Sequence, residues 1–294
     1  PVDRETAALM RVTTAQALLK LLLTEGDKLA VAQLTTLEDQ GGYALASNYG
    51  SLVARTLFQP VEESARLEFS RVGGRDGGAG EPATSAAAAL LTALLRVHVL
   101  LALGLVALGP PLAHPFVYVV AGARWAEPPS AAAPILASYC WYLPVMGING
   151  VVEAFVQSVA PPDVLAWYSR VLVGASAAFV GTLGAGHALY AGHGAALAAA
   201  TGVGRESLLV LANLVGLGVR AAASWHYVRR FFGARVRVES LLPSWPAVAV
   251  LGVCAAVLRK RLPERGAPTA DALGVAAALL GAALATMYVV GRRS

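Results

Sequence analysis

The stretch SNYGSLVARTLFQPVEES, residues 47–64, decides how this chain is interpreted, because it concentrates polar groups inside an otherwise apolar sequence. It holds an arginine, amides, a proline and two carboxylates within about four helical turns. Polar side chains recur along it at steps of three or four residues, so a helix places them on one face. The resulting polar stripe comprises Asn48, Ser51, Arg55, Gln59, Glu62 and Arg66.

The composition predicts that this helix lies in a membrane. Of the 294 residues, 56% are hydrophobic and 14% are charged, whereas about a quarter of the residues in a soluble domain are charged. Apolar stretches of about 20 residues recur, which is the length that a hydrocarbon core of about 30 Å requires. We therefore expect an all-α polytopic membrane protein with about eight transmembrane helices. Their expected bounds are 13–36, 41–69, 84–109, 131–158, 164–190, 206–230, 244–260 and 269–291, joined by connections that include the Pro- and Gly-rich residues 109–130 and 192–206.

The distribution of basic residues is typical of a membrane protein and argues against a nucleic-acid partner. The net charge is +5, but Lys and Arg mostly flank the apolar segments, as the positive-inside rule describes. Ten of them on one side against six on the other predict that both ends of the chain lie in the cytoplasm. The start, PVDRETAALM, lacks an initiator Met, so we expect it to lie in the middle of a larger protein.

The first predicted helix carries further charges that face this stripe. A short turn near Gln40 joins the two helices, so residues at equal distance from the turn lie at one depth of an antiparallel hairpin. Glu25 then falls level with Arg55, as a candidate intramembrane ion pair, and Lys20 falls level with Gln59. Each such charge at the centre of a membrane helix costs about 2.5 to 3.5 kcal/mol. These side chains must therefore face protein, water or a polar ligand.

Two residues predict where these helices bend. Pro60 removes a backbone donor and usually kinks its helix, and Gly26 loosens the facing helix. The charges after the bend have two interpretations that the sequence leaves open. Glu62, Glu63 and Arg66 are either members of a functional site or solvated charges at a helix end beyond the bilayer.

Two later helices repeat the polar spacing. The fourth carries Asn149, Glu153 and Gln157 at four-residue steps, and the sixth carries Arg220 and Ser224. Hydrogen bonding between helices and the lining of a cavity are both consistent with this pattern.

The sequence contains no equipment for catalysis or metal binding. It has no nucleophile elbow and no phosphate-binding loop. His187 and His193 are close in sequence, but no Cys or carboxylate accompanies them, so no metal site is expected. Arg96 and His98 lie on one otherwise apolar helix, as snorkelling or satisfied core groups do. We expect a protein that needs no cofactor and is not an enzyme.

Four segments carry a family resemblance. They are LLKLLLTEGDK (18–28), DQGGYALASNYGSLVARTLFQPVEES (39–64), SYCWYLPVMGINGVVEAF (138–155) and ANLVGLGVRAAASWHYVRRFF (212–232). In this order they resemble the Rft-type family of eukaryotic oligosaccharide-lipid translocation proteins. The resemblance covers nearly the whole chain.

The resemblance implies a transporter of the multidrug/oligosaccharidyl-lipid/polysaccharide exporter superfamily, with two six-helix lobes around a central cavity. Residues 1–230 would form the second lobe and residues 231–294 two additional C-terminal helices, so the missing N-terminal lobe is an expected partner. The implied role is in N-glycosylation at the endoplasmic reticulum membrane. There the protein would move the dolichol-diphosphate heptasaccharide from the cytoplasmic to the luminal leaflet, in contact with membrane lipids.

The implied substrate suggests a role for each polar group. Cations offset the charge of a diphosphate, and amides replace water around a sugar. Carboxylates would pair with the cations while the site is empty, which makes the pairing a switch. The expected diphosphate contacts are Lys20, Arg55 and Arg220; the sugar contacts are Asn48, Gln59, Asn149 and Gln157; the charge-pairing residues are Glu25, Lys28, Glu62, Glu63 and Glu153; the hinge residues are Gly26 and Pro60.

Two other functions remain as alternatives. A cation-coupled multidrug exporter of the same superfamily would have acidic cavity residues without basic partners, and a membrane scaffold of the glycosylation pathway would not need the cavity charges at all.

Overall fold

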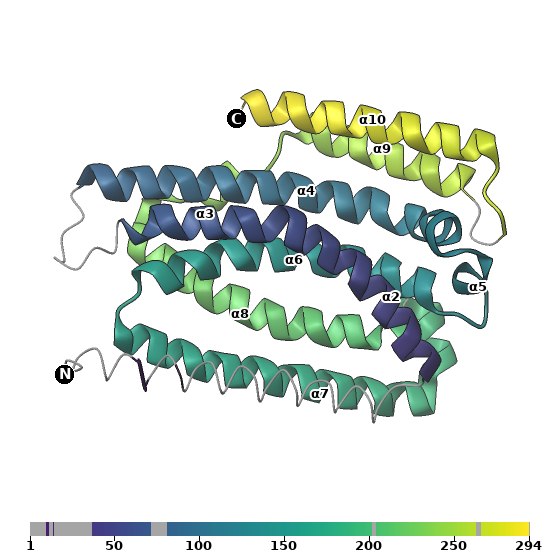
Figure 1. Cartoon of the computed structure of the whole chain (residues 1–294), viewed down its shortest axis with the longest axis horizontal. Helices are drawn as coiled ribbons and strands as arrows, with labels where there is room; N and C mark the ends of the chain where they lie inside the picture. The colour runs from purple at the N-terminus through teal and green to yellow at the C-terminus, as the bar shows by residue number, and fades with distance from the viewer. Residues whose placement is uncertain are drawn as a thin grey trace.

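The computed structural model describes residues 37–71, 81–201, 204–262 and 266–293, together with Met10, Arg11 and Thr14. These residues form a bundle of long helices whose axes run in broadly the same direction (Figure 1). Apart from Thr14, the predicted helix 13–36 lies outside the described residues. The same holds for its site residues Lys20, Glu25, Gly26 and Lys28.

The described helices follow the predicted apolar segments. Their bounds are α2 Leu37–Val53, a π-helical segment η1 Ala54–Phe58, α3 Gln59–Ser70, α4 Glu81–Ala121, α5 Ala123–Ala126, α6 Ala132–Val159, α7 Pro162–Thr201, α8 Leu208–Phe232, α9 Trp245–Arg261 and α10 Ala270–Arg293, with short 3-10 turns at Arg205–Ser207, Gly233–Arg235 and, as η4, Val238–Leu241.

Two of the predicted connections are shorter than expected, because the preceding helices extend into them. Helix α4 runs on past Pro110, Pro111 and Pro115 to Ala121. A proline in a membrane helix loses one backbone hydrogen bond, which packing against neighbouring helices can offset, and Pro115 is buried in the bundle. Helix α7 likewise extends to Thr201, with one residue, His193, outside helical geometry.

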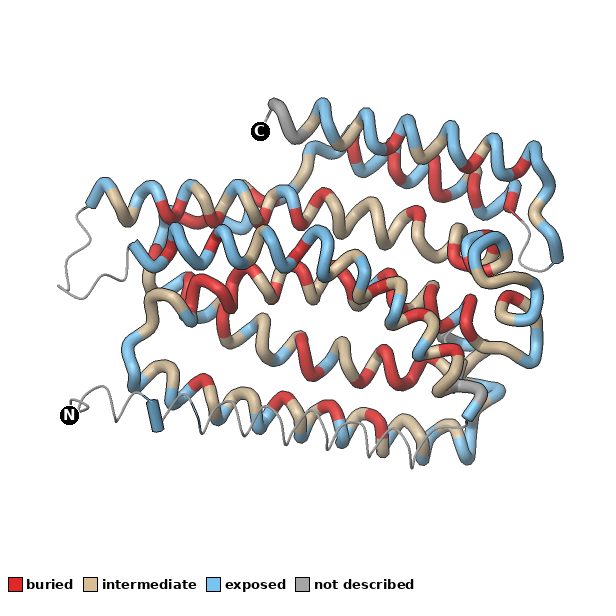
Figure 2. The backbone as a smooth tube through the Cα atoms, viewed as in Figure 1, coloured by how far each residue is buried: buried red, intermediate tan, exposed pale blue. Residues whose placement is uncertain are grey.

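Helix α6 lies at the centre of the bundle and contacts α2, α3, α4 and α8. Its aromatic side chains hold one end together: the Phe155 ring lies 5.2 Å from that of Phe69 on α3 and 4.8 Å from that of Phe232 on α8, between ring centroids. Helix α2 approaches α6 closely at Gly50, where a Cβ atom would stand 2.1 Å from the Tyr139 ring. Buried residues gather on these inward faces (Figure 2).

Three helices cover the outside of this arrangement. Helix α7 packs on α8, and α9 and α10 form a pair that packs on α4 (Figure 1). Both α7 and α10 present long exposed faces (Figure 2). Because most of this exposed surface is apolar, it suits contact with lipid.

Five described helices, α4, α6, α7, α8 and α10, are long and apolar enough to cross a membrane. The all-α polytopic membrane class is therefore confirmed. Two other predicted spans fall outside this description for different reasons. Helix α9 has only 17 residues. The segment from α2 to α3 carries the charged polar stripe from Asn48 to Arg66.

Candidate functional site

A polar cavity of about 240 Å³ lies among α3, α6 and α8. Three polar residues of its wall come from α3, two from α6 and one from α8. The polar lining residues are Gln59, Glu62, Arg66, Asn149, Glu153 and Arg220, and apolar side chains that include Phe58 and Leu217 complete the wall. The structure thus brings together residues that the sequence predicted separately on three helices.

The Glu153 carboxylate is the centre of the polar network. Its Oε2 atom accepts hydrogen bonds from Arg220 at 2.6 Å and from Asn149 at 2.9 Å. Its Oε1 atom accepts a hydrogen bond from Gln157 at 2.9 Å. Glu153 is buried, with 5% of its surface exposed. An ion pair this far from water is stable only where further hydrogen bonds satisfy the carboxylate, as they do here.

The network continues to α3 through one residue. Gln157 accepts a hydrogen bond from Arg66 Nη1 at 2.8 Å while it donates to Glu153. One connected chain of charges and amides therefore joins α3, α6 and α8. It includes Asn149, Glu153 and Gln157, so the polar spacing on α6 both bonds helices together and lines a cavity, and the two interpretations of it are not exclusive.

Glycines on α6 let α3 and the π segment approach. A Cβ atom on Gly150 would stand 1.7 Å from the Glu62 carboxylate. A Cβ atom on Gly147 would stand 2.8 Å from the His98 ring and 3.0 Å from Phe58. The Glu62 carboxylate therefore lies directly over the α6 backbone at the cavity, and any side chain at Gly150 would displace it.

Two polar atoms of this cavity region have no protein partner among the described residues. They are Oδ1 of Asn149 and Nε of Arg220, both buried. One is an acceptor and the other a donor, so Asn149 and Arg220 each retain a bonding atom that no described residue uses. A buried polar atom left without any partner costs about 1 to 3 kcal/mol.

Sequence reasoning missed two tyrosines of this region. The Tyr168 hydroxyl on α7 accepts a hydrogen bond from Ser224 at 3.0 Å and lies within electrostatic reach of Glu153 and Arg220. Tyr142 on α6 lines the cavity itself. The spacing of Tyr142 to Asn149, seven residues or two helical turns, was the available signal for it.

Three of the predicted site residues lie away from this cavity. Asn48, Arg55 and Glu63 are exposed, and none of them lines it. Arg55 bonds within its own helix, where Nη2 donates to the Ser51 hydroxyl at 3.0 Å and Nε donates to the Ser51 carbonyl at 3.2 Å. Its predicted partner Glu25 is outside the described residues.

The bend predicted at Pro60 has a structural counterpart. The π-helical segment Ala54–Phe58 ends two residues before Pro60, and α2 runs at an angle to α3 across it (Figure 1). Prolines and π segments are two of the common causes of a helix kink. Whether the bend moves during function stays a prediction.

Comparisons with known proteins cover most of the chain. Residues 2–294 match the model of the family described as Rft protein. The protein named Man(5)GlcNAc(2)-PP-dolichol translocation protein RFT1 is 34% identical in Yarrowia lipolytica, over 84% of this chain and 36% of that relative. Its namesake in Saccharomyces cerevisiae is 36% identical over 56% of this chain and 28% of the relative, and the one in Xenopus tropicalis is 32% identical over 82% and 43%. The chain thus spans about a third of the length of these relatives. No solved structure matches it.

Proposed function

The chain belongs to the Rft protein family, and from this premise we propose that it is part of a protein that translocates a dolichol-diphosphate-linked heptasaccharide. The movement would run from the cytoplasmic to the luminal leaflet of the endoplasmic reticulum membrane, in protein N-glycosylation. The relatives support this proposal through their names, which specify Man(5)GlcNAc(2)-PP-dolichol translocation and no enzymatic reaction.

The packing of the described helices supports a proposed domain organisation. Residues 1–230 would form one lobe of the transporter, and residues 231–294 would add a helix pair to it. In support, α9 and α10 contact each other and α4, while the polar cavity is built by α3, α6 and α8. A second lobe, supplied by the remainder of the longer protein, would complete the translocation path.

The observation that carries the proposal is the bond between Glu153 and Arg220 at the wall of a polar cavity. A diphosphate is an oxyanion, and it competes for a guanidinium with the same geometry as a carboxylate. The amides of Asn149, Gln157 and Gln59 can replace the water around sugar hydroxyls. Arg220 thus offers a contact to the diphosphate, and the amides offer contacts to the sugar.

The pairing also provides a switch. With the cavity empty, Arg220 binds Glu153, and with substrate present, Arg220 would bind diphosphate. A ligand shifts a conformational equilibrium only by its different affinity for the two states. Exchange of the carboxylate for the diphosphate supplies that difference. Arg55, exposed one helical turn before the cavity-lining Gln59, would make the first contact.

The test is leaflet translocation of the glycolipid in vesicles by the purified longer protein that contains this chain. We expect Arg55→Leu to lower the rate at least about tenfold, because one charged hydrogen bond to a phosphate contributes about 1.5 to 3 kcal/mol. Arg170→Leu, at an exposed arginine of α7, is the matched control and should retain the rate. Equal rates for native protein and Arg55→Leu would favour the scaffold alternative.

A further inference from the structure

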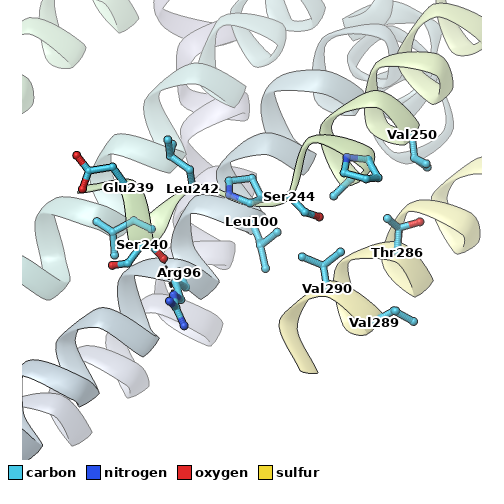
Figure 3. Close-up of a pocket in the computed structure, with 14 residues that line it drawn as sticks. Arg96, Leu100, Glu239, Ser240, Leu242, Ser244, Val250, Thr286, Val289 and Val290 are labelled. Atoms are coloured by element: carbon cyan, nitrogen blue, oxygen red, sulfur yellow. Dashed lines mark hydrogen bonds between the residues drawn. The ribbon is translucent and has the colours of Figure 1, made fainter. Parts of the chain in front are cut away.

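Two adjoining hollows lie apart from the polar cavity and share no lining residue with it. The first is a groove of about 660 Å³ between α4, α10 and the connection into α9 (Figure 3). The second, of about 810 Å³, lies between the end of α8 and the connection that follows it. Glu239 and Ser240 of η4 line both hollows. The two hollows are therefore neighbours with one shared wall.

The groove is polar at one end and apolar at the other. In Figure 3, Arg96 and Ser240 stand at one end, while Val250 of α9 and Val289 and Val290 of α10 stand at the other. Arg96 is held in place by a hydrogen bond from its Nε to the Ser240 carbonyl at 2.6 Å. This division, with a charged end and an aliphatic end, matches a molecule that has a charged head and a hydrocarbon chain.

The second hollow supplies the charges that a lipid headgroup needs. Arg229 and Arg237 line it and are exposed. Within the described parts of the chain, neither guanidinium has a hydrogen bond or an ion pair, in contrast to Arg235, which pairs with Glu81. Two unpaired arginines beside one carboxylate, Glu239, give this hollow a net positive charge.

The position of the basic hollow corresponds to the surface of the membrane, and the groove extends from it toward the hydrocarbon core. Helix α4 has 41 residues and is about 60 Å long, twice the thickness of the hydrocarbon core, so its ends project beyond that core. The α8–α9 connection exposes Leu242 by 66% and Trp245 by 79%. Exposed Trp next to a membrane helix is typical of the headgroup level. The basic hollow lies beside these residues, on the side that the charge distribution predicts to be cytoplasmic.

We propose that this pair of hollows binds an anionic glycerophospholipid. The phosphate lies between Arg229 and Arg237, and an acyl chain follows the groove past Val250 and Val289. Clusters of Lys and Arg beside membrane helices attract anionic lipids with about 1 kcal/mol for each residue. Glu239, on the shared wall, can accept a headgroup ammonium, so phosphatidylserine matches all three charges. The bound lipid would fill the space between the α9–α10 pair and α4.

The test measures lipid binding, and so it is independent of translocation. The purified longer protein is titrated with phosphatidylserine, phosphatidylcholine or dolichyl phosphate in detergent, and bound lipid is counted by native mass spectrometry. We expect phosphatidylserine to bind at least about tenfold more tightly than phosphatidylcholine, and the double variant Arg229→Gln/Arg237→Gln to lose about ten- to thirtyfold in affinity. Arg259→Gln/Arg261→Gln removes two exposed charges at the other end of α9 and should stay within about twofold.

A second pair of variants tests the groove. Val250→Trp fills it and should lower phosphatidylserine affinity severalfold, whereas Val253→Trp, on the same helix and 63% exposed, lies outside the groove lining and should not. Equal binding of phosphatidylserine and phosphatidylcholine, or an equal loss in both arginine double variants, would overturn the proposal. Displacement of phosphatidylserine by an equal concentration of dolichyl phosphate would overturn it too, since the site would then belong to the polyprenyl chain.

Discussion

Two arginines of the polar helices, Arg220 and Arg55, have opposite surroundings. Arg220 is mostly covered, with 26% of its side chain exposed, and it binds a carboxylate from another helix at 2.6 Å. Arg55 is exposed and bonds only to Ser51 of its own helix among the described residues. The charge of Arg220 is therefore already compensated inside the protein, while that of Arg55 is open to a partner from outside. We therefore expect stability to depend on Arg220 and the proposed attraction of substrate to depend on Arg55.

The largest effect on stability is expected for a substitution of Glu153, the partner of Arg220. We expect Glu153→Leu to lower the free energy of unfolding by about 3 to 5 kcal/mol, because it leaves Arg220 buried without a counter-ion. Three donors, from Asn149, Gln157 and Arg220, would lose their acceptor in the same change. Unfolding of the purified protein in detergent, together with its abundance in the membrane, measures this effect.

A double variant serves as the control for this prediction. Glu153→Leu/Arg220→Met replaces both charges with apolar side chains of similar size, and such replacements of buried ion pairs are often neutral or stabilising. Most of the lost stability should return. If the double variant is as unstable as Glu153→Leu alone, the amide contacts and not the ion pair hold the three helices together.

A smaller effect on stability is expected at the contact between α2 and α6. In Gly50→Ala, the new Cβ atom would stand 2.1 Å from the buried Tyr139 ring. Overpacking costs about 1 to 3 kcal/mol, and the better helix propensity of Ala returns up to about 1 kcal/mol. We expect a net loss of about 1 to 2 kcal/mol, measured by the same unfolding experiment.

Gly218→Ala on α8 is the matched change, because nothing lies within 4 Å of a Cβ atom at that position. It should be neutral or slightly stabilising. A loss of stability in Gly218→Ala equal to that in Gly50→Ala would show that backbone effects, and not the contact with Tyr139, decide the outcome.

The smallest effect on stability is expected at Arg55 itself. Arg55→Leu removes two hydrogen bonds within one exposed helical turn, so the free energy of unfolding should change by no more than about 0.5 kcal/mol. The same variant is the one expected to lose translocation. A destabilisation above about 1 kcal/mol would mean that Arg55 has a structural role after all, and the contrast with Arg220 would fail.

Hydrophobic length predicted most of the helices correctly, because a membrane helix is defined by how many apolar residues it contains. The expected spans 131–158 and 244–260 differ from α6 and α9 by a single residue at each end. The predicted bounds differ most from the structure where Gly and Pro indicate a connection. Residues 109–116 remain helical because apolar side chains such as Ala113 and Val117 are buried in the bundle there and outweigh the local preference of proline for a turn.

The polar residues were predicted as stripes, but not as partners. Periodicity shows that Asn149, Glu153 and Gln157 share one face of α6, since that depends only on spacing along one helix. It does not show which helix faces them. Glu153 and Arg220 are 67 residues apart in sequence, so their pairing depends on the order in which the helices pack around α6. That information was not available from one sequence.

The π-helical segment Ala54–Phe58 sets the direction in which the polar side chains before it point, relative to those on α3. An α-helix rotates by about 100° and rises by about 1.5 Å for each residue, and a π turn accommodates about one residue more than an α turn. Conversion of this segment to regular α-helix would therefore rotate α2 about its own axis by about 100° relative to α3. Both helices would stay intact. The Arg55 side chain would then point in a different direction relative to Gln59 and Glu62, while α3 stayed packed on α6. The one extra residue of the π turn, which lies before Pro60, is enough for that rotation.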